Sequence, residues 1–396
     1  MEFLSQNRVI GRAMAVAILA GLAGTIPVTA IEQGARGQSQ STAPVLAQAR
    51  RALTSGQPAL ALRLVDPLLA KSPGDKELVT IGIQAAIALD SNSRALSIYD
   101  TFVQAAGAPS AEVLKPIALK TLNDVVSGAA TDPRLRAESL ERLARDGDAR
   151  ASGSLRQEGQ SPQTRLALIA DASLARLGDD AATKRIAARI SAADDLPKTA
   201  EAEAAARAGK PELAPLLVPL LKNRDPYTRA TAAEGLGALG YKTAVEEIRP
   251  LMSDPFVEVR TKAGLAMARL GDSAGRNLVA TMLRSPVTDV KLAAIEAGGS
   301  MMGPERLVIL RSIMTDRDPL NRIRAAEAVA PDDPGAALAV LVQLTHHADT
   351  LVRREAGRVL EGFTPVDLEL ARRLIVDSEA WVRMYGAGAI LRAARR

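Results

Sequence analysis

The sequence of 396 residues contains no cysteine and only two histidines. Without cysteine the chain forms no disulfide, performs no thiolate chemistry and holds no zinc ion or iron–sulfur cluster through thiolates. The two histidines, His346 and His347, are adjacent, and neighbours in sequence do not share a face of a helix. They predict a turn between helices rather than a metal site, and no cofactor is expected.

Motifs of hydrolytic and nucleotide-binding sites are also missing. The chain has no G-x-S-x-G or Walker pattern, and Gly235-Leu236-Gly237 lies within a helical segment rather than after a strand. No catalytic residue is predicted, and the protein is expected not to be an enzyme. A net charge of +5, spread over so long a chain, is too small to predict binding of nucleic acid.

Aromatic side chains make up only 2% of the chain, whereas apolar residues make up 47%. The core must therefore be built from Ala, Leu, Val and Ile. Small and aliphatic side chains of this kind favour closely packed helices. The composition predicts an all-α protein.

The N-terminus has the pattern of a secretory signal peptide. Arg8 and Arg12 precede an uncharged stretch of 19 residues, and Val28-Thr29-Ala30 supplies the small residues that a signal peptidase requires. Residues 1–30 are therefore expected to direct export to the periplasm or cell envelope. The uncharged stretch also reaches the lower limit of a membrane span, so an uncleaved membrane anchor stays as an alternative, as does a cytoplasmic protein with an apolar N-terminus.

Two further segments precede the main body of the chain. Residues 31–43 are rich in Gly, Gln and Ser and predict a flexible linker. Residues 44–109 have a period of 34, which relates Val45 to Val79, Ala61 to Ala95 and Val65 to Tyr99. With Pro73 closing its first unit, this segment resembles tetratricopeptide repeats, and two helix pairs are expected in it.

A basic residue recurs about every 31 positions through the last two-thirds of the chain. This basic ladder consists of Arg136, Lys198, Arg229, Arg260, Lys291, Arg322, Arg353 and Arg383, with Ala167 in place of one rung. Small residues follow the later rungs by three positions, at Ala232, Ala263, Ala294, Ala325, Ala356 and Gly386. Glycines have the same spacing, at Gly147, Gly178, Gly209, Gly240 and Gly271. Such a period predicts a solenoid.

Each unit is expected to be a helical hairpin, and residues 243–272 are the clearest copy. A first helix carries an apolar stripe, Ser253-Asp254-Pro255 ends it, and a second helix continues to Leu270. Gly271 then suits the left-handed conformation that ends many helices. The small residue at Ala263 allows the backbones of neighbouring helices to approach closely.

These units resemble the HEAT repeat family, especially the short HEAT-like repeats of phycobilisome lyases. The matching residues are Asp254-Pro255 with Val259-Arg260, Asp132-Pro133 with Leu135-Arg136, His347-Ala348-Asp349 with Val352-Arg353, and Leu-Gly-Asp at 177–179 and 270–272. The resemblance covers residues 110–396 and implies an α-solenoid of about nine hairpins, an armadillo-type superhelix. HEAT-like hydroxylases need several His-Glu pairs for their di-iron centre, and this sequence has none.

The resemblance also implies roles for individual residues. Each basic rung is expected to pair with a turn carbonyl or an acidic residue of a neighbouring unit, such as Asp225, Asp254, Asp316 or Asp377. Pro219 and Pro250, 31 residues apart, are expected to kink the first helices of their units.

The single tryptophan, Trp381, lies four residues before Tyr385 in the last second helix. An exposed Trp–Tyr pair would suit contact with a partner protein. The alternative is that Trp381 fills the open end of the solenoid, where a polar terminal helix acts as a cap.

Solenoids of this kind usually bind rather than catalyse. We expect an exported scaffold, monomeric by itself, that binds another protein along a concave groove on the order of 80 Å long. Second helices line that groove in HEAT proteins, so the candidates for contact are Glu234, Glu258, Glu296, Glu327 and Arg358. The alternatives are a chromophore lyase or isomerase and an accessory subunit of a larger envelope complex.

Overall fold

The computed structural model describes residues 42–128, 132–192, 196–298 and 305–395. Contacts between residues divide the chain into Met1–Ala43 and Pro44–Arg396. The predicted signal peptide and nearly all of the predicted linker lie outside the described residues. Within the described ranges all regular structure is helical, so the all-α prediction is confirmed.

Four helices precede the 31-residue repeats: α1 (Ala43–Thr54), α2 (Pro58–Lys71), α3 (Lys76–Ala88) and α4 (Asn92–Ala106). Asp75 begins α3 by accepting hydrogen bonds from the backbone N–H groups of Glu77 and Leu78. Gly107, with a φ of 72°, ends α4. Both α3 and α4 contact the next helix, α5. The two expected helix pairs are present, and their likeness to tetratricopeptide repeats stays a prediction.

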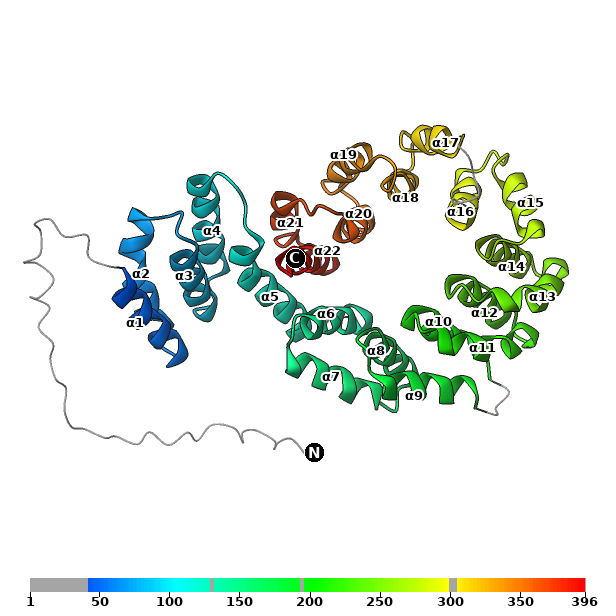
Figure 1. The fold of residues 1–396 in the computed structure, drawn as a ribbon, viewed down its shortest axis with the longest axis horizontal. Coiled ribbons are helices and arrows are strands. Elements are labelled where there is room, and N and C mark those ends of the chain that lie inside the picture. Colours follow the sequence, from blue (N-terminus) through cyan, green and yellow to red (C-terminus); the bar gives the residue numbers. More distant parts are fainter. Residues whose placement is uncertain (1–41, 129–131, 193–195, 299–304, 396) are drawn as a thin grey trace, which may run out of the picture. The chain divides into compact units, whose positions relative to one another are not determined.

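Nine hairpins follow in the described residues, which agrees with the number expected (Figure 1). Seven have two regular helices: α5 (Ala111–Ser127) with α6 (Pro133–Arg145), α7 (Ala149–Gly159) with α8 (Thr164–Arg176), α9 (Asp180–Ile190) with α10 (Thr199–Ala208), α15 (Ser273–Met282) with α16 (Thr288–Gly298), α17 (Glu305–Ile313) with α18 (Pro319–Val329), α19 (Pro334–Leu344) with α20 (Thr350–Gly362), and α21 (Leu368–Leu374) with α22 (Ala380–Ala394).

The fourth and fifth hairpins have broken first helices, as their prolines predict. Before α12 (Pro226–Ala238) the chain forms 3₁₀ turns at Pro211–Leu213 and Pro219–Lys222 around the short α11 (Ala214–Leu217). Before α14 (Val257–Arg269) it forms 3₁₀ turns at Lys242–Ala244 and Arg249–Ser253 around the short α13 (Val245–Ile248). Proline lacks the N–H of an α-helical bond, and the tighter 3₁₀ geometry accommodates its loss.

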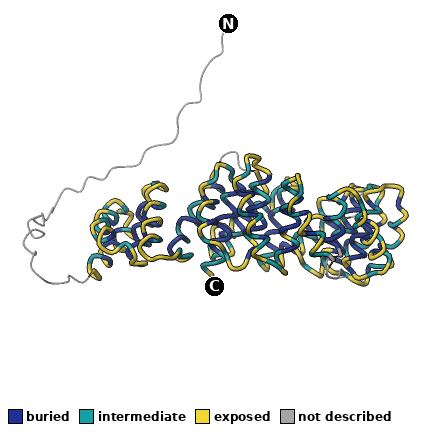
Figure 2. The backbone as a smooth tube through the Cα atoms, turned by 90° about the horizontal axis from the view of Figure 1, so that it is seen from above, coloured by how far each residue is buried: buried dark blue, intermediate teal, exposed yellow. Residues whose placement is uncertain are grey.

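The small residues of the repeat have the predicted roles. All five repeat-end glycines have a positive φ, from 65° at Gly209 to 100° at Gly147. Ala232, Ala263, Ala294, Ala325 and Ala356 are completely buried. Within α12, a Cβ added to Gly237 would lie 2.8 Å from the Cα of Ala266, so α12 and α14 pack nearly backbone to backbone. Buried residues run through the helix layers and exposed residues lie at their edges (Figure 2).

Two rungs of the basic ladder join neighbouring hairpins through an aspartate. Arg229 donates from Nε and Nη2 to Asp254 of the next unit, at 2.8 and 3.0 Å, and from Nη1 to two carbonyls of its own turn. Arg353 pairs in the same way with Asp377, at 3.0 and 3.3 Å. A guanidinium has enough donors to hold both its turn and the next unit.

Other rungs bind carbonyls or have different partners. Arg260 and Arg383 donate to carbonyls of their own turns, Arg136 donates to Glu158 at 2.7 Å, and Lys198 donates to the carbonyl of Arg189. The position of the paired aspartate holds Ser285 after Arg260 and His347 after Arg322. This substitution explains why those two rungs lack the ion pair to the next unit among the described residues.

Asp316 and Asp225 accept hydrogen bonds from threonines near the turns instead of pairing with a basic rung. Asp316 accepts from the hydroxyl of Thr288, although the rung of the preceding unit is Lys291. Asp225 accepts from the backbone N–H and the hydroxyl of Thr228. Of the four acidic residues expected to pair with rungs, Asp254 and Asp377 do so.

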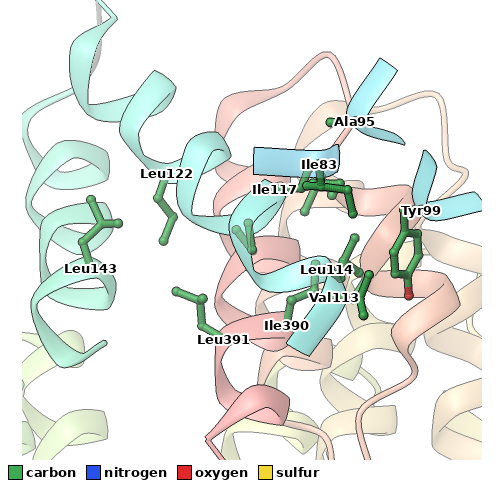
Figure 3. Close-up of a cluster of buried hydrophobic side chains, with 14 of the residues drawn as sticks. Ile83, Ala95, Tyr99, Val113, Leu114, Ile117, Leu122, Leu143, Ile390 and Leu391 are labelled. Atoms are coloured by element: carbon green, nitrogen blue, oxygen red, sulfur yellow. The ribbon is translucent and has the colours of Figure 1, made fainter. Parts of the chain in front are cut away.

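The last helix of the array packs against the first. Each second helix contacts the second helix of the next unit, from α6 through α8, α10, α12, α14, α16, α18 and α20 to α22, and α22 then contacts α5 (Figure 1). Figure 3 shows Ile390 and Leu391 of α22 among Leu114 and Leu122 of α5, within one buried cluster. The array therefore closes on itself, and the open end expected near Trp381 is absent among the described residues.

Polar contacts reinforce this closing seam between α5 and α22. Arg142 of α6 makes a two-pronged ion pair with Glu361, at 2.7 and 2.6 Å, across 219 positions of sequence. Arg372 donates to Asp100 of α4 at 3.1 and 2.8 Å, across 272 positions. Gly388 of α22 leaves room for the Arg142–Glu361 pair, because a Cβ there would overlap the Glu361 carboxylate. These contacts join residues that the repeat period does not relate.

Candidate functional site

The closing seam brings the first three hairpins and the last two around one cavity of about 790 Å³. Residues at the start of α6, along α8 and along α10 form one wall, and Arg354 of α20 and Trp381 of α22 form the other. Four arginines line it, at Arg134, Arg165, Arg207 and Arg354, against the carboxylates of Asp132 and Glu203. We call this the seam cavity.

Trp381 and Arg354 form the C-terminal wall together. The guanidinium carbon of Arg354 lies 3.9 Å from the centre of the Trp381 ring, which is the distance of a close cation–π contact. The Nε of Arg354 is buried and has no hydrogen-bond partner among the described residues. Stacking on the ring therefore fixes this cation without neutralising its charge.

Arg134 and Arg207 on the opposite wall share one carboxylate. Glu138 of α6 lies 3.1 Å from Arg134 and 3.3 Å from Arg207, and it also lies 3.6 Å from Arg142. Burial lowers the pKa of Arg207, and the charges of Arg134 and Arg176 lower it further, against the effect of Glu138. Glu203 also lies 3.9 Å from Arg207, so two carboxylates face this guanidinium.

Arg165 lies in the first turn of α8 and is exposed. In the described part of the chain no carboxylate is within ion-pair distance of Arg165 or of Arg354. Asp132 faces the cavity, but its side chain accepts from the backbone N–H groups of Arg134 and Leu135 at the start of α6. The seam cavity therefore suits an anionic ligand with flat or apolar neighbouring groups.

Trp381 and Tyr385 are not the exposed pair of one sequence-based hypothesis. Their exposed fractions are 7% and 4%, because both belong to the cluster buried at the closing seam. Burial, with Glu138 nearby, raises the pKa of Tyr385 to about 12, and Arg142 lies over its ring at 5.5 Å. Trp381 does not fill an open end either, since the end of the array is covered by α5.

The histidines lie in the turn before α20, as predicted. His346 Nδ1 lies 3.1 Å from the carbonyl of Val342, and His347 Nδ1 accepts from the backbone N–H of Asp349. Over the described ranges, no group of three or more His, Asp or Glu side chains is placed to hold a metal ion.

Four of the five expected groove residues form ion pairs between neighbouring second helices. Glu234 pairs with Lys262 at 2.8 Å, Glu296 with Arg324 at 2.9 Å, and Glu327 with Arg358 at 2.7 Å. Each pair bridges two neighbouring hairpins. Glu258 is exposed, at the first turn of α14.

Large apolar side chains are exposed where the second helices of the middle units begin. Their exposed fractions are 65% at Leu196, 67% at Tyr227, 52% at Phe256, 66% at Val257 and 52% at Val287. Leu196 and Tyr227 are 31 residues apart, as are Phe256 and Val287, so these side chains follow one edge of the repeats. We call this the apolar edge.

Sequence reasoning missed the seam cavity because its walls are about 200 positions apart in the chain. One signal was present: Arg354 directly follows the rung Arg353, and no other rung is followed by a second basic residue. The ladder accounts for the first arginine but not for the second.

Comparison with known proteins agrees with the repeat architecture. A family model described as HEAT repeats matches residues 214–299 and 245–330. No curated protein matches the chain. Among solved structures, human deoxyhypusine hydroxylase in complex with glycerol is similar, with 20% identity and a TM-score of 0.33 over 64% of this chain and 99% of that chain. Every helix of the described ranges is too short or too polar to traverse a bilayer.

Proposed function

Residues 214–330 match the HEAT repeat family, and on this premise we propose that the protein is an exported, non-enzymatic scaffold that binds another protein. The observation that carries the proposal is the apolar edge. Contiguous apolar side chains on a protein surface mark interaction sites, whereas scattered ones need no explanation. Here two pairs of them, Leu196 with Tyr227 and Phe256 with Val287, recur at equivalent positions of adjacent hairpins.

The composition of the apolar edge suits a protein partner. Tyr227 and Val257 are each exposed by about two-thirds, on neighbouring helices α12 and α14 that are in contact. Aromatic residues are enriched at protein interfaces because they bury large areas at a small cost in conformational entropy. In a chain with 2% aromatic residues, the two at the apolar edge, Tyr227 and Phe256, stand out.

Export rests on the N-terminal sequence, where Arg8 and Arg12 precede the uncharged stretch and Val28-Thr29-Ala30 follows. The proposal places the described hairpins on the outer side of the inner membrane, with residues 31–43 as a tether.

The test is affinity capture of the full chain, expressed with a C-terminal tag, from periplasmic, membrane and cytoplasmic fractions, with mass spectrometry of bait and captured protein. The double variant Tyr227→Ser with Val257→Ser removes the centre of the apolar edge. The matched control is Val308→Ser with Val376→Ser, which replaces exposed valines outside it, 70% and 53% exposed.

We expect one envelope protein to be captured by the wild type and the control and to be lost, by about tenfold or more, with the edge variant. The bait is expected to begin near Ile31. Equal capture by both double variants would exclude the apolar edge as the contact. A bait with an intact N-terminus in the cytoplasmic fraction would overturn export.

A further inference from the structure

We propose that the seam cavity binds an acidic segment of the partner protein, through Arg165, Arg354 and Trp381. This inference rests on the proposed scaffold function and adds the chemistry of a second contact. The segment would be an extended stretch rich in Asp or Glu, with a carboxylate on each of the two arginines and its stem against the tryptophan ring.

Arg354 carries the strongest part of the argument. Its guanidinium is held on the Trp381 ring at 3.9 Å, while its buried Nε lacks a hydrogen-bond partner in the part of the chain that the structure describes. A buried donor on a cation costs free energy unless an acceptor reaches it. A carboxylate matches the planar fork of a guanidinium better than any other side chain does.

The surrounding charges favour an anion and reject a cation. The lining has four arginines against Asp132 and Glu203, which leaves a net charge of +2. Glu138 behind the wall lies within ion-pair distance of Arg134, Arg142 and Arg207, so three guanidiniums share its single negative charge. Arg165 stands exposed, where it meets a ligand first.

The dimensions select a peptide segment rather than a folded domain. The cavity of about 790 Å³ falls within the range of roughly 300–1,000 Å³ of ligand sites, enough for several side chains. Because Trp381 supplies an apolar surface next to the two arginines, an amino-acid side chain with a methylene stem fits better than a bare inorganic anion.

The chain has a built-in reporter for this site. Trp381 is its only tryptophan, so fluorescence excited at wavelengths that the four tyrosines do not absorb comes from the seam cavity alone. The full chain is titrated with a short glutamate-rich peptide and with its glutamine counterpart, and the fluorescence of Trp381 is followed. A dye-labelled form of the glutamate peptide gives affinities by anisotropy. Inorganic phosphate, free glutamate and a single-stranded oligonucleotide are added as competing anions that could displace the labelled peptide.

Two charge variants, Arg165→Gln and Arg354→Gln, are compared with Arg276→Gln, which removes an exposed arginine from α15. Circular dichroism and melting temperature confirm that each variant is folded. We expect the glutamate peptide alone to change the fluorescence of Trp381. Its affinity should fall about tenfold for each of the two arginines removed, as expected for loss of a charge-assisted hydrogen bond, and stay unchanged in the control.

Several results would overturn the inference: equal binding of the glutamine peptide, equal affinity in all three variants, or stronger binding of the oligonucleotide. Free glutamate or phosphate binding as tightly as the peptide would show a small-anion site instead. The two proposals fail separately. The wild type and the double variant Arg165→Gln with Arg354→Gln could capture a partner equally, while the wild type binds no peptide. That result would support the scaffold function and reject the seam cavity as a binding site. Binding of the glutamate peptide without capture of any partner would support the cavity as a binding site and reject the scaffold function.

Discussion

Two seams hold this array together in different ways. Between α12 and α14, an ordinary seam joins consecutive hairpins through Gly237 against Ala266 and through the Arg229–Asp254 ion pair. At the closing seam, α22 packs against α5 through larger side chains such as Leu391, and the Arg142–Glu361 pair joins α6 to α20 beside them. Contact between consecutive second helices recurs with the repeat, whereas the closing seam occurs once. Repetition therefore stacks the hairpins, and residues outside the repeat pattern decide where the stack meets itself.

The largest expected effect comes from cutting one buried leucine in each seam. Leu391→Ala and Leu236→Ala both remove a completely buried side chain, and each should lower the free energy of unfolding by about 2–5 kcal/mol. Hydrogen exchange read by mass spectrometry should differ between them. Leu391→Ala should lose protection in both α5 and α22, and Leu236→Ala in α12 and its neighbours. Loss confined to α21 and α22 in the first variant would show that closure does not stabilise α5.

Overpacking tests the close approach within the ordinary array. Ala263 is completely buried, so Ala263→Leu should destabilise by about 1–3 kcal/mol in urea unfolding. Arg269→Leu, on an exposed position of the same helix, is the control and should change the free energy of unfolding by less than about 0.5 kcal/mol. An unchanged melting temperature for Ala263→Leu would contradict close packing at this position.

The two ion pairs allow a direct comparison of the seams. Double-mutant cycles with Arg142→Met and Glu361→Gln, and with Arg229→Met and Asp254→Asn, should each give a coupling of about 1–2 kcal/mol. The side chains are comparably buried, at 15% and 21% exposure in the first pair and 12% and 6% in the second. A coupling near zero for Arg142–Glu361 alone would mean that apolar packing closes the array by itself.

The smallest expected effect is a dependence of the ordinary seam on acid. The hydrogen bond from Arg229 lowers the pKa of Asp254, burial opposes it, and the N–H of Phe256 lowers it further. The folded state thus binds this proton less readily than the unfolded state. Its stabilisation is present above the ordinary pKa of about 3.9 and is lost as pH falls through the lowered folded value. As pH falls across that range, the free energy of unfolding measured in urea should therefore decrease less for Asp254→Asn than for the wild type. An identical dependence on pH in the two proteins would contradict this.

Sequence periodicity predicted what one hairpin does to the next. The glycine conformations, the buried alanines, the broken helices at Pro219 and Pro250 and two of the Arg–Asp pairs all depend on contacts within about one repeat. Closure depends on the rotation summed over nine units, and a small change in each unit moves α22 far from α5. Arg142, Glu361 and Gly388 have no period that relates them, and so the seam cavity and the burial of Trp381 were not foreseen.

Contact of α22 with α5 changes how the array can begin to unfold. An open row of hairpins frays from its ends, because a terminal hairpin detaches by leaving a single neighbour. In a closed array every hairpin has two neighbours, so the first hairpin to detach must lose two interfaces at once. The closing seam thus adds one interface to the equilibrium stability but removes the easiest starting point of unfolding, which is the property that slows attack by proteases.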